Sequence, residues 1–306
     1  MDGLKPVGRF APTPSGRMHL GNVFAALLAW LSVRSRDGEL VLRMEDLDTQ
    51  RTSSDFARVL REDLQWLGLD YDRETPPQSQ RTEAYDEAFR ILEEKGLIYP
   101  CYCTRSQLHS VNAPHLSDGT YVYPGTCRHL TEAQRGAFDR KPAWRVIVPE
   151  KRWEFTDRVQ GKYSLDLSSE CGDMVVRRAD GVYVYQLAVT VDDGAAGVTE
   201  VTRGMDLLSS APRQMYLQQL LGLPHPEYAH VPMLLAPDGR RLSKRDRDLD
   251  LGRLRLLLSP EQLIGSLACS AGVLDRPEAV SARELAGEFS WDRVRKNDIV
   301  LNSLPL

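Results

Sequence analysis

The sequence predicts an α/β protein built on a doubly wound parallel sheet, which is interrupted by an inserted subdomain and followed by a short C-terminal helical segment. Three observations support this prediction. A strand, a helix and a second strand follow one another over residues 7–45, and this βαβ order implies a parallel sheet with a right-handed crossover. Between residues 99 and 180 the pattern changes to short alternating strands and clustered cysteines. Regular α/β patterning returns at residues 182–189, as expected for one sheet split by an insertion.

Each element follows from a local pattern of residues. A short strand over 7–11 ends at Pro12 and Pro14, and apolar residues at helical spacing over 22–36 predict a helix that closes at Gly38. Residues 39–45 resemble a second buried strand, and two amphipathic helices are expected, over 56–67 and from residue 85 to Gly96. The later elements are expected as a strand over 143–148, a helix over 210–221 and a strand over 231–235.

The bulk composition indicates a globular protein without a membrane segment. The chain has 306 residues, a net charge of −4 and a pI near 5.9, so no overall basic field points to nucleic acid, although a local basic stripe can sit on an acidic protein. No apolar run approaches the roughly 18 residues of a membrane span, and the first residues lack a signal-peptide pattern. We therefore expect a cytoplasmic protein without a membrane partner, and a monomer, since nothing suggests an obligate dimer.

The segment between the first strand and the first helix is suited to binding phosphate. Gly16 and Gly21 allow a tight turn and a close approach of the backbone, and the helix then begins with free N–H groups at its positive dipole end. His19 is placed to donate a hydrogen bond to phosphate oxygens. Taken alone, the same residues would more often be a capped helix with a surface histidine.

A second segment, near the C-terminus, strengthens that interpretation. A strand leads to the Asp238–Gly239 turn and then to a basic loop that contains Lys244. A lysine on such a loop can close over a triphosphate and stabilise the leaving pyrophosphate. Alone, the loop would be a solvated run of charges, but the two segments together indicate that the chain activates a carboxylate with ATP.

These segments resemble the two signatures of the class I aminoacyl-tRNA synthetases. The run His19-Leu-Gly-Asn22 resembles the HIGH signature, and Arg241-Leu-Ser-Lys-Arg245 resembles KMSKS, with Arg241 in place of its first lysine. Further runs, from Arg9-Phe-Ala-Pro-Thr-Pro-Ser-Gly16 to Arg203-Gly-Met-Asp-Leu-Leu208, are similar to the glutamyl group of this family. The resemblance covers residues 8 to 250 and implies a Rossmann-type catalytic domain formed by residues 1–98 and 181–240.

The resemblance also implies roles for individual residues. Glutamate carries one ammonium and two carboxylates, so its pocket needs an acid, for which Glu45 is suited, and an arginine such as Arg203 with its planar fork. The implied catalytic residues are His19 and Lys244, both of which stabilise the charged transition state. The implied ATP-binding residues are Pro12, Ser15, Gly16, His19, Gly21, Asn22, Ser243 and Lys244. The implied glutamate-binding residues are Arg9, Ala11, Thr13, Glu45, Tyr185 and Arg203.

Three cysteines within the insertion suggest a zinc site. Cys101, Cys103 and Cys127 supply soft ligands suited to tetrahedral zinc. We therefore expect residues 99–180 to form a zinc-containing subdomain, and the resemblance implies that this subdomain receives RNA. Ligand chemistry alone leaves three histidines open as the fourth ligand, His109, His115 and His129. The resemblance points instead to Tyr123, because zinc-bearing members use Cys-x-Cys followed by Tyr-x-x-x-Cys. We expect this Zn²⁺ to be structural, and Mg²⁺ to enter with ATP.

The part of the chain after Lys244 is short. Residues 241–306 provide the loop and a few helices, and we expect no anticodon-binding domain there. This pattern is similar to the glutamyl-queuosine tRNA(Asp) synthetases, the shortened paralogues of the glutamyl group. The resemblance implies that L-glutamate is activated without tRNA and transferred to the queuosine base of tRNA(Asp). Two alternatives remain, a truncated enzyme that charges a tRNA 3′ end, and an inactive paralogue that binds RNA or glutamate.

Overall fold

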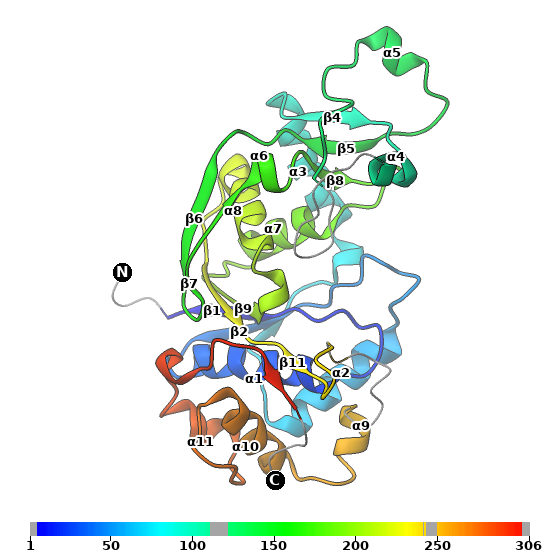
Figure 1. Cartoon of the computed structure of the whole chain (residues 1–306). Coiled ribbons are helices and arrows are strands. Elements are labelled where there is room, and N and C mark those ends of the chain that lie inside the picture. The colour runs from blue at the N-terminus through cyan, green and yellow to red at the C-terminus, as the bar shows by residue number, and fades with distance from the viewer. Residues whose placement is uncertain (1–4, 111–121, 241, 243–249, 302–306) are drawn as a thin grey trace.

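The core of the molecule is a five-stranded parallel sheet (Figure 1). The computed structural model describes residues 5–110, 122–240, 242 and 250–301. The strands lie in the order β10–β9–β1–β2–β3, and every pairing between them is parallel. Their bounds are β1 Val7–Phe10, β2 Glu39–Leu42, β3 Arg73–Glu74, β9 Glu200–Gly204 and β10 Glu227–Val231. Strand β1 therefore lies beside a strand that comes about 190 residues later, which confirms the predicted parallel α/β sheet formed from both ends of the chain.

One face of the sheet is covered by α1 (Leu20–Arg34). The helix is buried on nearly all sides, because the sheet lies against one side of it and the C-terminal helices lie against the other (Figure 1). Those helices are α10 (Pro260–Ala271) and α11 (Ala282–Ala286). Helix α2 (Ser54–Leu67) joins the same apolar cluster through its buried leucines.

A group of three helices lies on the opposite side of the sheet. They are α3 (Thr82–Glu94), α7 (Tyr185–Ala195) and α8 (Ser210–Leu221), which pack on one another. Val201 of the sheet lies in a buried cluster with Ala211 of α8. Helices on both faces make the sheet doubly wound, and α8 has the bounds that its periodicity predicts.

The expected single strand over 231–235 is wrong. Strand β10 ends at Val231, and a separate strand β11 (Leu234–Leu235) pairs with β12 (Ile299–Val300) outside the main sheet. Pro232, which has no N–H to donate, stands at the break. The C-terminal segment consequently contains a short strand as well as helices, which the helical prediction missed.

The segment between the two halves of the sheet forms two small antiparallel sheets. One consists of β4 (Ile98–Cys101), β5 (Ala143–Val146) and β8 (Met174–Arg177), and the other is the hairpin of β6 (Arg152–Asp157) and β7 (Gly161–Asp166). The remaining short helices are α4 Arg105–Ser110, α5 Glu132–Gly136, α6 Leu167–Glu170, α9 Leu251–Leu254 and the 3₁₀ turns η1 Gln78–Gln80, η2 Met205–Leu207 and η4 Trp291–Arg293. Among the helices in the described part of the chain, none has the length and apolar character needed to cross a bilayer.

Candidate active site

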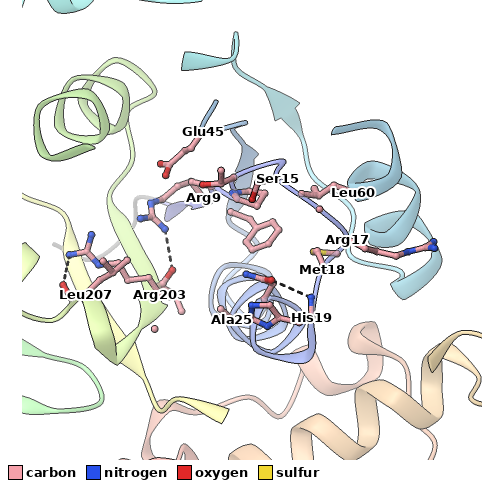
Figure 2. A pocket seen from close by; sticks show the side chains of 18 of the residues that line it. Arg9, Ser15, Arg17, Met18, His19, Ala25, Glu45, Leu60, Arg203 and Leu207 are labelled. Atoms are coloured by element: carbon pink, nitrogen blue, oxygen red, sulfur yellow. Dashed lines mark hydrogen bonds between the residues drawn. The ribbon is translucent and has the colours of Figure 1, made fainter. Parts of the chain in front are cut away.

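A cleft of about 430 Å³ lies at the carboxyl ends of β1 and β9 (Figure 2). Open parallel sheets bind ligands at this edge, where neighbouring strands run to helices on opposite faces. The cleft is lined by every predicted ATP or glutamate residue within the described chain except Gly21, namely Arg9, Ala11, Pro12, Thr13, Ser15, Gly16, His19, Asn22, Glu45, Tyr185 and Arg203. Residues that are far apart in the sequence thus face a single cavity.

His19 caps the N-terminus of α1. Its Nδ1 accepts a hydrogen bond from the Gly21 N–H at 3.1 Å, and its own N–H donates to Asn22 Oδ1 at 3.3 Å. Because Nδ1 is an acceptor, the proton of the neutral ring is on Nε2, which is then a donor. A Cβ on Gly21 would lie 3.1 Å from the imidazole Nδ1, so Gly21 makes room for His19 and does not itself line the cleft.

Hydrogen bonding between the first two strands continues beyond the strands themselves. The Arg43 N–H donates to Phe10 O at 3.0 Å, and the Glu45 N–H donates to Pro12 O at 3.0 Å. Glu45 therefore lies three residues past β2 but remains aligned with the start of the phosphate-binding turn. This alignment places the carboxylate of Glu45 at the edge of the cleft, opposite the backbone of Pro12, a residue that was also predicted to bind the ligand.

Beneath the cleft lies a buried network of charges. The guanidinium of Arg43 is 0 % exposed, and it contacts Asp193 at 2.6 Å, Glu45 at 3.2 Å and Asp192 at 3.8 Å. Arg9 adds a second cation, with its Nε 3.5 Å from Asp193 Oδ1 and its Nη1 donating to Thr202 O at 3.1 Å. Asp193 is thus neutralised by arginines from the ends of β1 and β2, whereas Asp192 also pairs with Arg81 at 2.5 Å.

The network shifts the pKa values of two carboxyl groups in opposite directions. Burial raises the pKa of Glu45, and Arg43 and Arg9 offset this only in part. Burial acts the same way on Asp193, but the arginines Arg43 and Arg9 together hold its pKa below the ordinary value. Asp193 is therefore held in its ionised form. The ionised form of Glu45 is less favoured, and a cationic ligand would stabilise it.

No role was predicted from the sequence for Arg43, Asp192 or Asp193. Asp192 accepts hydrogen bonds from Gln78 Nε2 at 2.8 Å and from the Tyr85 hydroxyl at 2.9 Å. A signal was present in the sequence, because two adjacent acids interrupt an apolar helical run, and buried acids require partners. The pattern does not say which arginine supplies the charge.

Arg203 is held by three acceptors at the end of β9. Its Nη1 donates to Gln214 Oε1 at 2.8 Å, its Nη2 to Leu207 O at 3.3 Å, and its Nε to His230 Nε2 at 2.9 Å. An arginine carries five N–H groups, so one N–H on each terminal nitrogen remains for a ligand. This geometry suits the binding of a carboxylate.

Two predicted residues, Ser243 and Lys244, lie outside the described residues. The chain on either side of them is placed: Leu242 packs in the core cluster that contains Met18, and Asp250 pairs with His19 in a β-bridge. The Leu251 N–H donates to Met18 O at 3.1 Å. The chain that follows the second signature thus meets the residues that precede α1.

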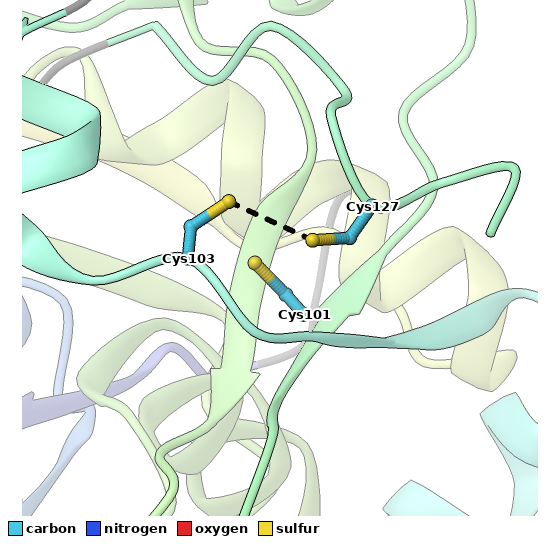
Figure 3. Close-up of side chains that lie close together, drawn as sticks. All are labelled: Cys101, Cys103 and Cys127. Atoms are coloured by element: carbon cyan, nitrogen blue, oxygen red, sulfur yellow. Dashed lines mark hydrogen bonds between the residues drawn. The ribbon is translucent and has the colours of Figure 1, made fainter. Parts of the chain in front are cut away.

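Three thiols converge in the inserted segment (Figure 3), and the phenol of Tyr123 lies beside them. The Sγ atoms of Cys103 and Cys127 are 3.6 Å apart, and the Tyr123 hydroxyl lies 3.4 Å from Cys101 Sγ and 3.7 Å from Cys103 Sγ. Zinc bonds of about 2.3 Å to sulfur and 2.0 Å to oxygen would give tetrahedral edges of roughly 3.5–3.8 Å, so the four atoms fit the ion. His129 is exposed and outside this cluster, His109 has no described side chain, and His115 lies outside the described residues.

The thiols differ in how easily they lose a proton. Burial disfavours the thiolate of Cys101, but Arg145, whose Nε donates to its Sγ at 3.2 Å, brings the pKa of this thiol below the ordinary value. Burial raises the pKa of Cys103 to about 11, so a bound cation would be needed to displace that proton at neutral pH. The cluster is therefore compatible with a soft divalent cation, which would stabilise the thiolates.

Comparison with known proteins agrees with this geometry. Residues 6–256 match the family described as tRNA synthetases class I (E and Q), catalytic domain. The chain belongs to this family. It is therefore a ligase of the class I aminoacyl-tRNA synthetase type, as the two signatures predicted.

Curated relatives of the class I synthetase resemble it over nearly its whole length. A protein of Symbiobacterium thermophilum named Glutamyl-Q tRNA(Asp) synthetase is 45% identical over 95% of this chain and 94% of its own. A protein of the same name from Nocardia farcinica is 44% identical over 96% of this chain and 92% of its own. These relatives confirm the resemblance to the shortened paralogues of the glutamyl group.

A solved structure supports the fold. The glutamate tRNA ligase of Elizabethkingia meningosepticum, in complex with its amino acid, superimposes with a TM-score of 0.84 at 28% identity. The match covers 98% of this chain and 68% of that one. The similarity thus extends through the inserted segment and the C-terminal helices as well as the sheet.

Proposed function

We propose that this synthetase activates L-glutamate with Mg²⁺-ATP and transfers it to the queuosine base in the anticodon of tRNA(Asp). One observation supports the activation of glutamate: Glu45 and the two remaining N–H groups of Arg203 line the same cleft. The queuosine acceptor rests on the names of relatives that match this chain over nearly all of its length.

In this proposal, glutamate binds where the strands end. Glu45 accepts the α-ammonium, and Arg203 and Arg9 bind carboxylate oxygens. Tyr185, the first residue of α7, offers a hydroxyl to the same ligand. Ala11 and Thr13 complete the pocket at the exit from β1.

ATP would lie along the phosphate-binding turn. Pro12, Ser15, Gly16, His19 and Asn22 line this part of the cleft, with Gly21 behind His19. We assign Ser243 and Lys244 to the same nucleotide, because the chain that follows them pairs with His19 and bonds to Met18 just before α1.

The reaction would proceed in two steps. A carboxylate oxygen of glutamate attacks the α-phosphorus, the bond to pyrophosphate breaks, and His19 and Lys244 stabilise the charge that develops. A hydroxyl of the modified base then attacks the acyl carbon, AMP leaves, and the hydroxyl proton is lost. The protein contributes positioning and electrostatic stabilisation.

The division of the chain follows the same proposal. Residues 1–98 and 181–240 would form the Rossmann-type catalytic domain, 99–180 the RNA-receiving subdomain, and 241–306 the loop and the C-terminal segment. Cys101, Cys103, Tyr123 and Cys127 would hold a structural Zn²⁺ in that subdomain, which ties β4 to the chain before β5.

Replacing Cys103 with serine is expected to abolish stoichiometric zinc binding and to lower the stability of the inserted segment, since a tetrahedral site loses one of its four ligands. Elemental analysis of the purified protein measures the zinc content. Cys269→Ser, at an isolated cysteine of α10, is the matched control. Tyr123→Phe should weaken zinc binding and His129→Ala should not. The opposite result would identify His129, and not Tyr123, as the fourth ligand.

Lowering the pH from 7.5 to 5.5 is expected to raise the KM for glutamate more than the KM for ATP. The ammonium binds the ionised form of Glu45, and since burial raises the pKa of this group, its ionised fraction falls at a higher pH than that of an ordinary glutamate. Glu45→Gln should raise the KM roughly 10- to 100-fold and remove this pH dependence. Glu62→Gln, on the exposed side of α2, is the control. An unchanged pH profile in Glu45→Gln would exclude Glu45 as the ammonium site.

The proposed acceptor is tested by incubating the protein with ATP, labelled glutamate and total tRNA, and then identifying the labelled nucleotide. We expect label on the queuosine of tRNA(Asp) and none when the tRNA lacks that base. Label on a 3′ end, independent of queuosine, would favour the truncated charging enzyme instead. Absence of glutamate-dependent pyrophosphate exchange would favour a binding paralogue.

A further inference from the structure

A buried histidine connects Arg203 to the inserted hairpin. His230 lies on β10, the strand next to β9, and its side chain is 0 % exposed. Its Nε2 accepts from Arg203 Nε at 2.9 Å, and its Nδ1 lies 2.6 Å from Asp157 Oδ2. Three buried side chains therefore form a continuous line from the hairpin to the cleft.

The proton positions in this line follow from the charges around it. Burial and the charge of Arg203 lower the pKa of His230 to about 4, although Asp157 opposes the shift. The neutral ring has one N–H, and since Nε2 accepts from Arg203, that proton is on Nδ1 and points to Asp157. Each member thus has the donor or acceptor that its neighbour requires.

Asp157 is itself held in place. It is the last residue of β6, and its Oδ1 accepts from the N–H groups of Val159 and Gln160 at 2.9 Å each. The His230 N–H also donates to this carboxylate at 3.1 Å. The turn of the hairpin and β10 therefore set the position of the carboxylate, which in turn orients the imidazole.

We propose that Asp157 and His230 are positioning residues that orient the guanidinium of Arg203 for a glutamate carboxylate. The inference rests on the proposed binding of glutamate by Arg203. It adds that the inserted hairpin, through Asp157, helps to determine which amino acid the catalytic cleft accepts. Neither residue lines the cleft, so both act through Arg203 alone.

An asparagine at position 157 separates this role from simple support of the fold. Its carbonyl oxygen can keep the hydrogen bonds from Val159 and Gln160, while its amide N–H groups face His230 Nδ1. The imidazole must then take its proton on Nε2, where it opposes the N–H of Arg203 Nε. The change reverses the direction of one hydrogen bond and removes almost no volume.

The experiment measures pyrophosphate exchange and the His230 tautomer together. Asp157→Asn and His230→Leu are expected to raise the KM for glutamate roughly 10- to 100-fold while the KM for ATP changes less than about 2-fold. His230→Gln, which keeps an acceptor for Arg203, should recover most of the affinity. Nitrogen-15 NMR of the imidazole should show the proton on Nδ1 in the unaltered protein and on Nε2 in Asp157→Asn.

Two outcomes would overturn the proposal. One is an Nε2–H imidazole in the unaltered protein, and the other is a glutamate KM in Asp157→Asn that stays within about 2-fold of the original. A loss of ATP affinity equal to that for glutamate would show a structural role and also overturn it. Absence of glutamate-dependent exchange in the unaltered protein would instead reject the proposed function, and the NMR result would still decide the tautomer.

Discussion

Replacing Arg203 with alanine is expected to lower glutamate-dependent pyrophosphate exchange by at least about 100-fold, with ATP binding largely retained. The guanidinium is buried, is oriented by Gln214 and His230, and leaves two N–H groups for a ligand. Removing one partner of a buried, hydrogen-bonded charge pair costs roughly 2–5 kcal/mol, because the other charge is left without compensation. Steady-state exchange and ATP titration measure the two effects separately.

Two further variants sharpen this test. Arg203→Lys should restore little of the exchange, since an ammonium lacks the planar fork that binds a carboxylate through two parallel hydrogen bonds. Arg34→Ala removes an arginine that pairs with Asp70 and Asp72 away from the cleft, and should leave the exchange nearly unchanged. Exchange in Arg203→Ala equal to that in Arg34→Ala would exclude Arg203 from the glutamate site.

Replacing Arg43 with methionine is expected to lower the free energy of unfolding by about 3–5 kcal/mol at pH 7. The methionine retains the apolar stem, so the main loss is the charge that faces Asp193, Asp192 and Glu45 within 2.6–3.8 Å. Denaturant titration measures the change. Arg58→Met breaks an exposed pair with Glu62 on α2 and should cost less than about 1 kcal/mol.

The pH dependence of that loss identifies its cause. In the unaltered protein Arg43 helps to keep the pKa of Asp193 low, so the folded state is stabilised by this carboxylate above its unfolded pKa and loses that stabilisation in acid. Without Arg43, Arg9 alone of these two arginines opposes the effect of burial, so the pKa of Asp193 rises and protonation relieves part of the uncompensated charge. The difference between the two proteins should therefore shrink between pH 7 and pH 5. A constant difference would point to packing instead.

The elements that sequence predicts well are those specified by a local period or by a capping residue. Helix α8 has the predicted bounds, and the first helix, predicted over 22–36, runs from Leu20 to Arg34 with His19 as its N-cap. The strand over 231–235 was predicted wrongly because one apolar run serves two sheets, and Pro232 separates them. The pairing of β11 with β12, a strand from the end of the chain, has no local signature at all.

The cleft shows the same division between local pattern and long-range packing. Its lining was predictable, because the residues belong to linear signatures whose types and spacing match a phosphate turn and an amino-acid pocket. The partners of Arg43 were not, because Asp192 and Asp193 lie about 150 residues away and meet it only when α7 packs on the sheet. A buried charged residue in the sequence indicates that an oppositely charged partner exists, but it does not indicate which residue that partner is.

The sequence by itself determined the family, the parallel sheet with its insertion and the set of residues that line the cleft. These properties depend on residue type and short spacing, which a linear chain carries directly. Only the tertiary structure decided how Arg203 is oriented, that the Asp157–His230 pair lies behind it, and that Arg43 meets the two acids of α7. Such contacts arise when elements distant along the chain pack together, and the directions of their hydrogen bonds are set by that packing rather than by any local pattern.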